Sequence, residues 1–309
     1  MTSRIEGQDA DDFLKVFWTS RFGIVPKANL FPRIRSTYIE STGTEQLSFE
    51  LADAAEKLEQ IDDPNHPAWS DIPGVAADYL RQISTIGSKQ VRPVILSALS
   101  RFEKGELESF LYILTVTLVR YQLIGRQRTG VLEKSLGTLS ERIWESSITT
   151  TDEAWRHLAP IIPSDEDFIE DFSTHLERKT YRLGYLLAAI EASSKTNDLD
   201  LERRAKDISS LLDTCQVDWI AKPSITSQGE ESDNIDKLIG NVVLLERSLV
   251  DQAKIEAPAE KMMKVYPQSS LTTTRSASNH FFWSRTFVVE RTRSLASAAP
   301  SAWPLWKNL

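Results

Sequence analysis

The segments VDWIAKPS (residues 217–224) and IGNVVLLERS (residues 239–248) decide how the C-terminal part of this chain folds. Both are short and rich in β-branched and aliphatic residues, which favours strands. A polar stretch with Pro223 and Gly229 separates them and predicts a loop. The residues after Arg247 again have the pattern of a helix. The sequence therefore predicts two short strands followed by a helix.

Almost everything before these segments has the pattern of amphipathic or buried helices. Leu47, Leu51, Leu58 and Ile61 recur at helical spacing, which predicts a helix over 45–61. Acidic residues at 9–12 predict the start of a helix near the N-terminus. Further helices are predicted over 73–86, 91–103, 106–127, 130–147, 151–158, 165–174, 176–195 and 200–213. The helix over 106–127 is apolar nearly all round, which is typical of the centre of a bundle.

The fold class that follows is mainly α. A helical domain over 1–212 precedes a small ββα-metal-like module over 213–309, which ends with a C-terminal helix. In that last helix, residues 282, 286, 289, 293 and 296 recur at helical steps, and the pattern stops near Pro300.

Composition places the chain among soluble globular proteins. Its 309 residues are 41% hydrophobic and 26% charged. No apolar run approaches the ~18 residues of a membrane span, and the N-terminus has no apolar signal core. Cys215 is the single cysteine, so no intrachain disulfide can form. We therefore expect a cytoplasmic protein with no membrane partner.

Positive charge concentrates at the C-terminal end, although the formal net charge is −8. From residue 261 onward Glu290 is the one acidic residue among seven basic ones. Such asymmetry favours contact with phosphate, while a solvated helix face is the alternative interpretation. The candidate nucleic-acid-binding residues are Lys261, Lys264, Arg275, Arg285, Arg291 and Arg293.

Two strands feeding a helix can build a one-metal nuclease site. In such a ββα-metal site a histidine at the end of the first strand takes the proton of the attacking water. A divalent ion polarises the phosphodiester, and an asparagine braces the loop or orients the base. The corresponding positions here are Asp218, Trp219 and Asn241.

The segment resembles the C-terminal, HNH-type nuclease domain of GmrSD-type modification-dependent restriction endonucleases. In that family the first strand reads acidic–His–Ile–x–Pro and the second motif resembles IGNLTLLEK, where this chain has VDWIAKP and IGNVVLLER. DDFLKVFWTSRFGIVPKANLF (residues 11–31) resembles the segment after the family's ParB-like NTPase domain. The family's closing pattern is echoed by Tyr266, Ser269, Trp283, Arg291, Arg293 and Trp303.

The resemblance implies a component of a bacterial restriction or anti-phage defence system. Because the NTPase domain is not part of the sequence, a separately encoded NTPase-domain protein is the partner that the resemblance implies. DNA is the second candidate partner.

The departures from the family motifs predict that catalysis is lost. The indole of Trp219 donates but cannot accept the water proton, and Val250 and Ile255 stand where the family has asparagines. Asp218 and Asn241 alone make a poor site for a hard cation. We therefore predict a degenerate nuclease fold with no metal ligands and no cofactor, in which Trp219 fills the core or, alternatively, stacks on a base.

Two other functions stay open at this stage. One is an active endonuclease with a rearranged site, which would need Mg²⁺ or Mn²⁺ and in which His280 could replace the missing base. The other is a helical interaction scaffold with no role in nucleic-acid binding.

Overall fold

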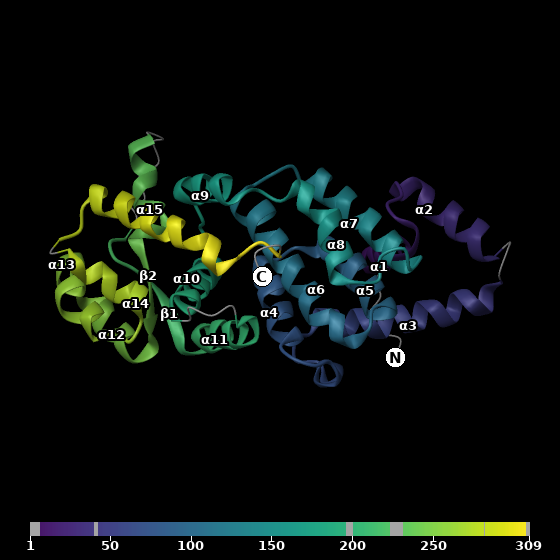
Figure 1. Cartoon of the computed structure of the whole chain (residues 1–309), viewed down its shortest axis with the longest axis horizontal. Coiled ribbons are helices and arrows are strands. Elements are labelled where there is room, and N and C mark those ends of the chain that lie inside the picture. The colour runs from purple at the N-terminus through teal and green to yellow at the C-terminus, as the bar shows by residue number, and fades with distance from the viewer. Residues whose placement is uncertain (1–6, 40–42, 196–199, 223–230, 281, 307–309) are drawn as a thin grey trace. The chain divides into compact units, whose positions relative to one another are not determined.

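The computed structural model describes residues 7–39, 43–195, 200–222, 231–280 and 282–306 (Figure 1). These residues are mainly helical, with one small antiparallel sheet of two strands, so the mainly α fold class is confirmed. Contacts within the chain divide it into a first unit, Met1–Tyr121 with Gln127–Ile162, and a second unit, Gln122–Arg126 with Pro163–Leu309.

The first unit is a helical bundle, and all its helices except α2 fall where the sequence predicts a helix. They are α1 (Gly7–Phe22), α2 (Lys27–Ile34), α3 (Thr44–Asp62), α4 (Ala76–Ile86), α5 (Arg92–Arg101), α6 (Lys104–Thr117), α7 (Thr129–Trp144) and α8 (Thr151–Leu158). As predicted, α6 is the most apolar of them, and its residues from Phe110 to Thr117 are all buried. The segment Lys104–Ile124 is long and apolar enough to cross a membrane by length and composition, but 83% of its most apolar window is buried inside the protein.

The second unit contains the sheet. Its larger helices are α9 (Asp165–Thr174), α10 (Thr180–Lys195), α11 (Leu201–Thr214), α12 (Arg247–Ile255) and α15 (Arg285–Ala302). Strands β1 (Cys215–Trp219) and β2 (Val242–Glu246) pair in register from Cys215 opposite Glu246 to Trp219 opposite Val242. The short helices α13 (Pro258–Glu260) and α14 (Thr272–Arg275) complete it.

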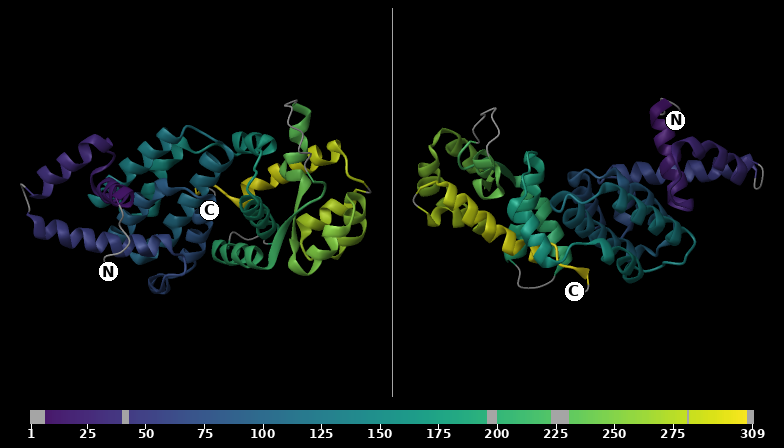
Figure 2. Two further views of the ribbon diagram at one scale, coloured as in Figure 1. Left: turned by 180° about the vertical axis from the view of Figure 1, so that it is seen from behind. Right: turned by 90° about the horizontal axis from the view of Figure 1, so that it is seen from above.

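Helices cover both faces of the hairpin. Helix α10 packs on both strands and α11 on β1, while α12 packs on both strands and α14 on β2. Figures 1 and 2 show these helices around the hairpin. Helix α15 packs along α9 and α10 and against the turn that precedes β2. The loop residues Pro223, Ser224 and Gly229, which the sequence analysis singled out, lie outside the described residues.

The division of the chain falls earlier than the predicted boundary between 212 and 213. Helices α9 to α11 belong to the second unit because they pack on its sheet and on α15. Glu191 of α10 illustrates this, since its buried carboxylate accepts hydrogen bonds from the backbone N–H groups of Thr272 and Thr273 at 2.9 and 2.8 Å. Long-range contacts of this kind leave no periodic trace in a sequence.

The residues predicted at helical steps, 282, 286, 289, 293 and 296, do not mark the buried face of α15, since only Ala296 among them is buried. Its buried residues include Phe287, Val288, Arg291 and Leu295, whereas Thr286 and Arg293 are exposed. The helix begins after Ser284, whose hydroxyl accepts from the backbone N–H of Phe287 at 3.1 Å. This start directs the stripe containing Phe287 and Leu295 toward the sheet, and Pro300 is accommodated in the last turn.

Candidate functional site

The hairpin presents one face to an apolar cluster, and Asp218 lies on that face. Asp218 is directly opposite Val243 in the sheet, so both side chains point the same way. The cluster comprises Val243, Leu245, Met262, Val265, Tyr266 and Phe287 among other buried residues. The Asp218 carboxylate therefore stands at the border of a hydrophobic core and needs partners there.

Lys261 and Tyr266 supply those partners. The ammonium of Lys261 lies 2.9 and 3.0 Å from the two carboxylate oxygens of Asp218 and also donates to the carbonyl of Trp219 at 2.8 Å. The hydroxyl of Tyr266 donates to Asp218 at 2.7 Å. Only 9% of the Lys261 side chain and 15% of the Asp218 side chain are exposed. The negative charge of Asp218 is thus neutralised within the protein.

The carboxylate of Asp218 also affects the pKa of Tyr266. Burial, together with the nearby negative charge of Asp218 and its hydrogen bond, raises the pKa of Tyr266 far above its usual range. Tyr266 is therefore a neutral donor at every physiological pH. It is a structural partner of Asp218 and supplies no base.

Asn241 uses its whole hydrogen-bonding capacity on the protein. Its side-chain oxygen accepts from the backbone N–H of Ala221 at 3.1 Å and from the indole N–H of Trp283 at 2.8 Å. Its amide nitrogen donates to the carbonyls of Ala221 and Asp236, both at 2.7 Å. A primary amide has two donors and two acceptor positions, so none remains for a ligand. Asn241 braces the chain that leaves β1.

Trp219 ends β1 and is partly exposed. Its backbone is held by the Lys261 hydrogen bond and by pairing with Val242. The indole supplies no acceptor at the position where a ββα-metal nuclease has its histidine.

None of the histidines takes over that role in the described part of the chain. His280, the one considered as a replacement, is exposed, and its ring lies 4.8 Å from that of Phe287. It makes no contact with Asn241, whose four bonds go elsewhere. Within the described residues no group of three or more His, Cys, Asp or Glu side chains could hold a metal ion.

The structure separates the six predicted basic residues into two kinds. Lys261 and Arg291 are buried. Arg291 donates to the carbonyls of Gly240 and Val242 at 2.9 and 2.6 Å and to that of Thr273 at 3.2 Å. Burial lowers the pKa of Arg291 to about 10, so it stays charged at neutral pH. These two charges stabilise the fold and are not available to bind phosphate.

Gly240 allows the approach that Arg291 needs. A Cβ at this position would collide with the carbonyl oxygen of Val288 and lie 2.8 Å from the backbone nitrogen of Thr292. Only a glycine lets α15 come this close to the turn before β2.

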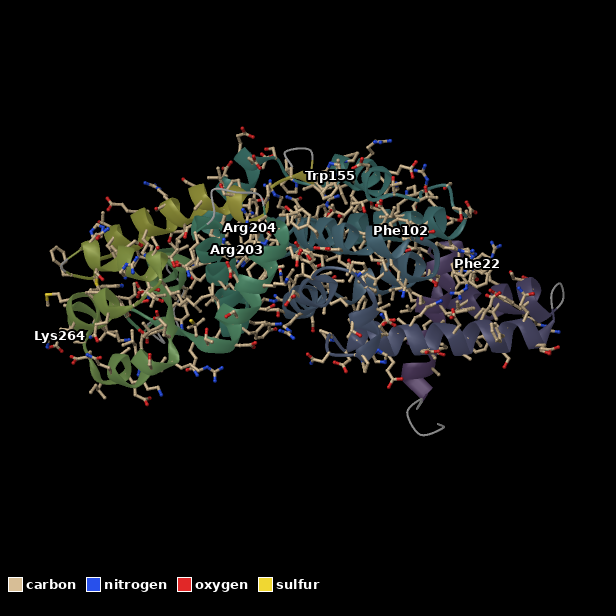
Figure 3. The ribbon with its side chains drawn as sticks, turned by 60° about the horizontal axis from the view of Figure 1, so that its bottom comes forward. Phe22, Phe102, Trp155, Arg203, Arg204 and Lys264 are labelled. Atoms are coloured by element: carbon tan, nitrogen blue, oxygen red, sulfur yellow. The ribbon has the colours of Figure 1, made fainter. Side chains whose placement is uncertain are left out.

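The other four basic residues are exposed. Lys264, at the periphery of its unit in Figure 3, pairs with Glu260 at 2.9 Å. Arg275 donates to the carbonyls of Ser269 and Ser270. Arg285 and Arg293 have no ion-pair or hydrogen-bond partner through their guanidinium groups among the described residues. They lie eight positions apart on one side of α15, a separation of roughly 12 Å along the axis.

Sequence reasoning missed the partners that convert the predicted site into a structural one. Tyr266 is 48 residues from Asp218, and Trp283 is 42 residues from Asn241. The one sequence signal for them was the resemblance of the closing pattern, since periodicity reports only local order.

No family model matches this chain, and no curated protein matches it.

Proposed function

We propose that the second unit contains a catalytically degenerate HNH-type nuclease-like module that binds DNA without cutting it. In this proposal the chain is a component of a bacterial restriction or anti-phage defence system and acts with a separately encoded NTPase-domain protein. Copurification with such a protein would test that partner.

The main observation behind the proposal is that both carboxylate oxygens of Asp218 are bound by side chains of the protein. A one-metal nuclease needs oxygen ligands that are free to hold its cation, and Asp218 is the carboxylate near the end of the first strand. Here the ammonium of Lys261 and the hydroxyl of Tyr266 take its two oxygens at 2.7–3.0 Å. A positive charge that belongs to the protein thus stands where a bound cation would be needed. The strand–strand–helix order and the bracing role of Asn241 support an HNH-like origin.

The residues of the closing pattern also support this origin. Tyr266 binds Asp218, Trp283 binds Asn241, and Arg291 binds the carbonyls at the start of β2. Each of these three therefore contacts the hairpin or the turn before β2, whereas Arg293 of the same pattern is exposed and Trp303 donates to the hydroxyl of Tyr185.

We expect the purified full chain to leave plasmid DNA uncut in Mg²⁺ or Mn²⁺. Loss of the general base alone lowers such rates by ~10²–10⁴. We also expect Trp219→His to remain inactive, because Lys261 still forms its ion pair with Asp218. Gel analysis of plasmid nicking checks both results. Metal-dependent cutting by the wild type that disappears in a folded Asp218→Asn variant would contradict the loss of catalysis.

The exposed arginines of α15 support DNA binding. Arg285 and Arg293 carry free charge on one side of a helix, with Val289 between them. Arginine forms paired hydrogen bonds with phosphate oxygens. Binding through such contacts releases counterions and weakens as salt rises.

We expect Arg285→Gln combined with Arg293→Gln to weaken duplex binding roughly tenfold or more and to reduce the salt slope of log K by about 2. Fluorescence anisotropy with a labelled duplex at several salt concentrations measures both quantities. Arg203→Gln with Lys206→Gln is the matched control, since it removes two exposed charges from α11 of the same unit. Equal affinities for the two double variants would refute the α15 interface.

A further inference from the structure

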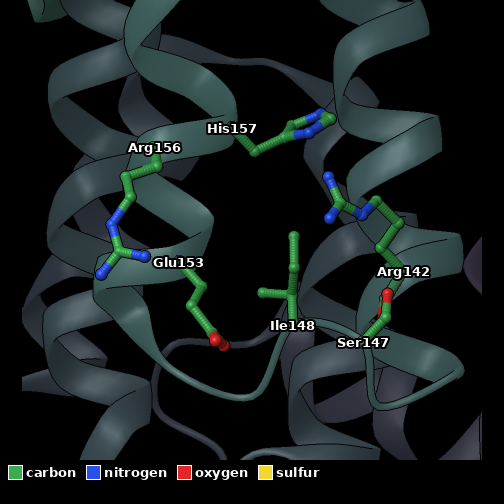
Figure 4. Close-up of a pocket in the computed structure, with 6 residues that line it drawn as sticks. All are labelled: Arg142, Ser147, Ile148, Glu153, Arg156 and His157. Atoms are coloured by element: carbon green, nitrogen blue, oxygen red, sulfur yellow. The ribbon is translucent and has the colours of Figure 1, made fainter.

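A pocket of about 300 Å³ lies in the first unit, where α7 ends and α8 begins. It is lined by Arg142, Ser147, Ile148, Glu153, Arg156 and His157. Figure 4 shows Ile148 between the two walls, with Arg142 and Ser147 on the α7 side and the remaining three on α8. The volume is at the lower end of the range for small-molecule sites.

The connection between the two helices shapes this pocket. Ser146 adopts a left-handed backbone with φ of 59°. The N–H groups of Ser147 and Ile148 then both donate to the carbonyl of Arg142, at 2.9 and 3.1 Å. Ile148 is only 2% exposed and forms an apolar floor. The α7 wall and the floor are therefore fixed by backbone hydrogen bonds.

The α8 wall is fixed in the same way, and its carboxylate is already engaged. Thr150 and Glu153 form a capping box, in which one oxygen of Glu153 accepts from the backbone N–H groups of Thr149 and Thr150 at 2.8 and 3.3 Å. These hydrogen bonds, the one from Thr149 foremost, lower the pKa of Glu153. Its negative charge is therefore used in hydrogen bonds at the N-terminus of α8.

The two arginines of the pocket are not engaged in this way. Among the described residues, the guanidinium groups of Arg142 and Arg156 have no hydrogen-bond or ion-pair partner. His157 places Nε2 at 3.0 Å from the carbonyl of Ser135. A carbonyl only accepts, so Nε2 carries the hydrogen, and Nδ1 of the neutral ring is an acceptor. The pocket thus offers two exposed guanidinium groups, one from each wall.

We propose that this pocket binds a phosphate group through the guanidinium groups of Arg142 and Arg156. Phosphate provides several acceptor oxygens that match planar guanidinium donors in pairs. The same chemistry is present in a free nucleotide and in a nucleic-acid backbone, and the experiment separates the two. The inference concerns the first unit and does not depend on the proposed role of the second.

Isothermal titration of the full chain with inorganic phosphate tests the proposal, with acetate at matched ionic strength as the comparison ion. We expect phosphate to bind and Arg142→Gln to weaken it at least tenfold, whereas acetate gives no saturable heat. Arg33→Gln is the matched control, because Arg33 is exposed in the same unit and outside the pocket. Thermal melting confirms that each variant is folded.

Adenosine monophosphate and a single-stranded oligonucleotide then identify the source of the phosphate. Loss of mononucleotide binding alone in Arg142→Gln assigns a small nucleotide-like ligand, and loss of oligonucleotide binding assigns a backbone phosphate. A phosphate dissociation constant weaker than about 10 mM overturns the proposal. Equal affinity of Arg142→Gln and Arg33→Gln for phosphate, or equal binding of acetate, also overturns it.

Discussion

We expect Lys261→Met to destabilise the second unit by about 3–5 kcal/mol, because it leaves the Asp218 carboxylate buried without its countercharge. Tyr266 would still donate one hydrogen bond, but the charge would remain uncompensated. The long apolar side chain of methionine keeps the packing of the lysine stem. The loss therefore reports the ion pair together with the hydrogen bond to the Trp219 carbonyl, and not a cavity.

Hydrogen exchange of peptides from β1 and β2 measures this effect in the full chain, where two units make a single melting transition hard to interpret. Lys264→Met is the matched control, since Lys264 is three positions away and exposed; we expect no change in protection. Adding Asp218→Asn to Lys261→Met should restore most of the stability, because no charge is then left unpaired. Protection unchanged in Lys261→Met would show that the pair does not hold the module together.

Asn241→Ala is expected to cost on the order of 4 kcal/mol, because it leaves polar groups on three segments without their hydrogen-bond partner. Asn241 is fully buried and serves the backbone of Ala221, the carbonyl of Asp236 and the indole of Trp283. In a nuclease this substitution is an obvious way to remove activity. In this protein Asn241→Ala would unfold the region around the hairpin. Its effect on any function must therefore be interpreted as structural.

Asn234→Ala provides the comparison, since Asn234 lies in the same segment between the strands and is exposed. Hydrogen exchange should rise in the β1 and β2 peptides of Asn241→Ala and stay at the wild-type level in Asn234→Ala. Indole fluorescence of Trp283 should also change, because its N–H loses its acceptor. Similar exchange in the two variants would refute the bracing role of Asn241.

The predicted site could be located from the sequence only in part. The strand positions around Asp218 and Asn241 follow from local composition, and both strands form where they were predicted. The roles of the two residues could not be predicted, since Lys261, Tyr266 and Trp283 reach them across more than 40 residues of chain. The exclusion of Trp219 as a base required only the chemistry of indole.

By itself, the sequence determined most of the helices and the two strands, because hydrophobic periodicity, capping residues and turn residues act over a few positions. The tertiary structure decided which charges are available to a ligand. Arg291 and Arg293 are neighbours on one helix, yet two positions rotate a side chain by roughly 200°, so Arg291 enters the core and Arg293 faces solvent. The face of α15 that meets the sheet is set by packing between segments far apart in the chain, and no local pattern encodes that choice.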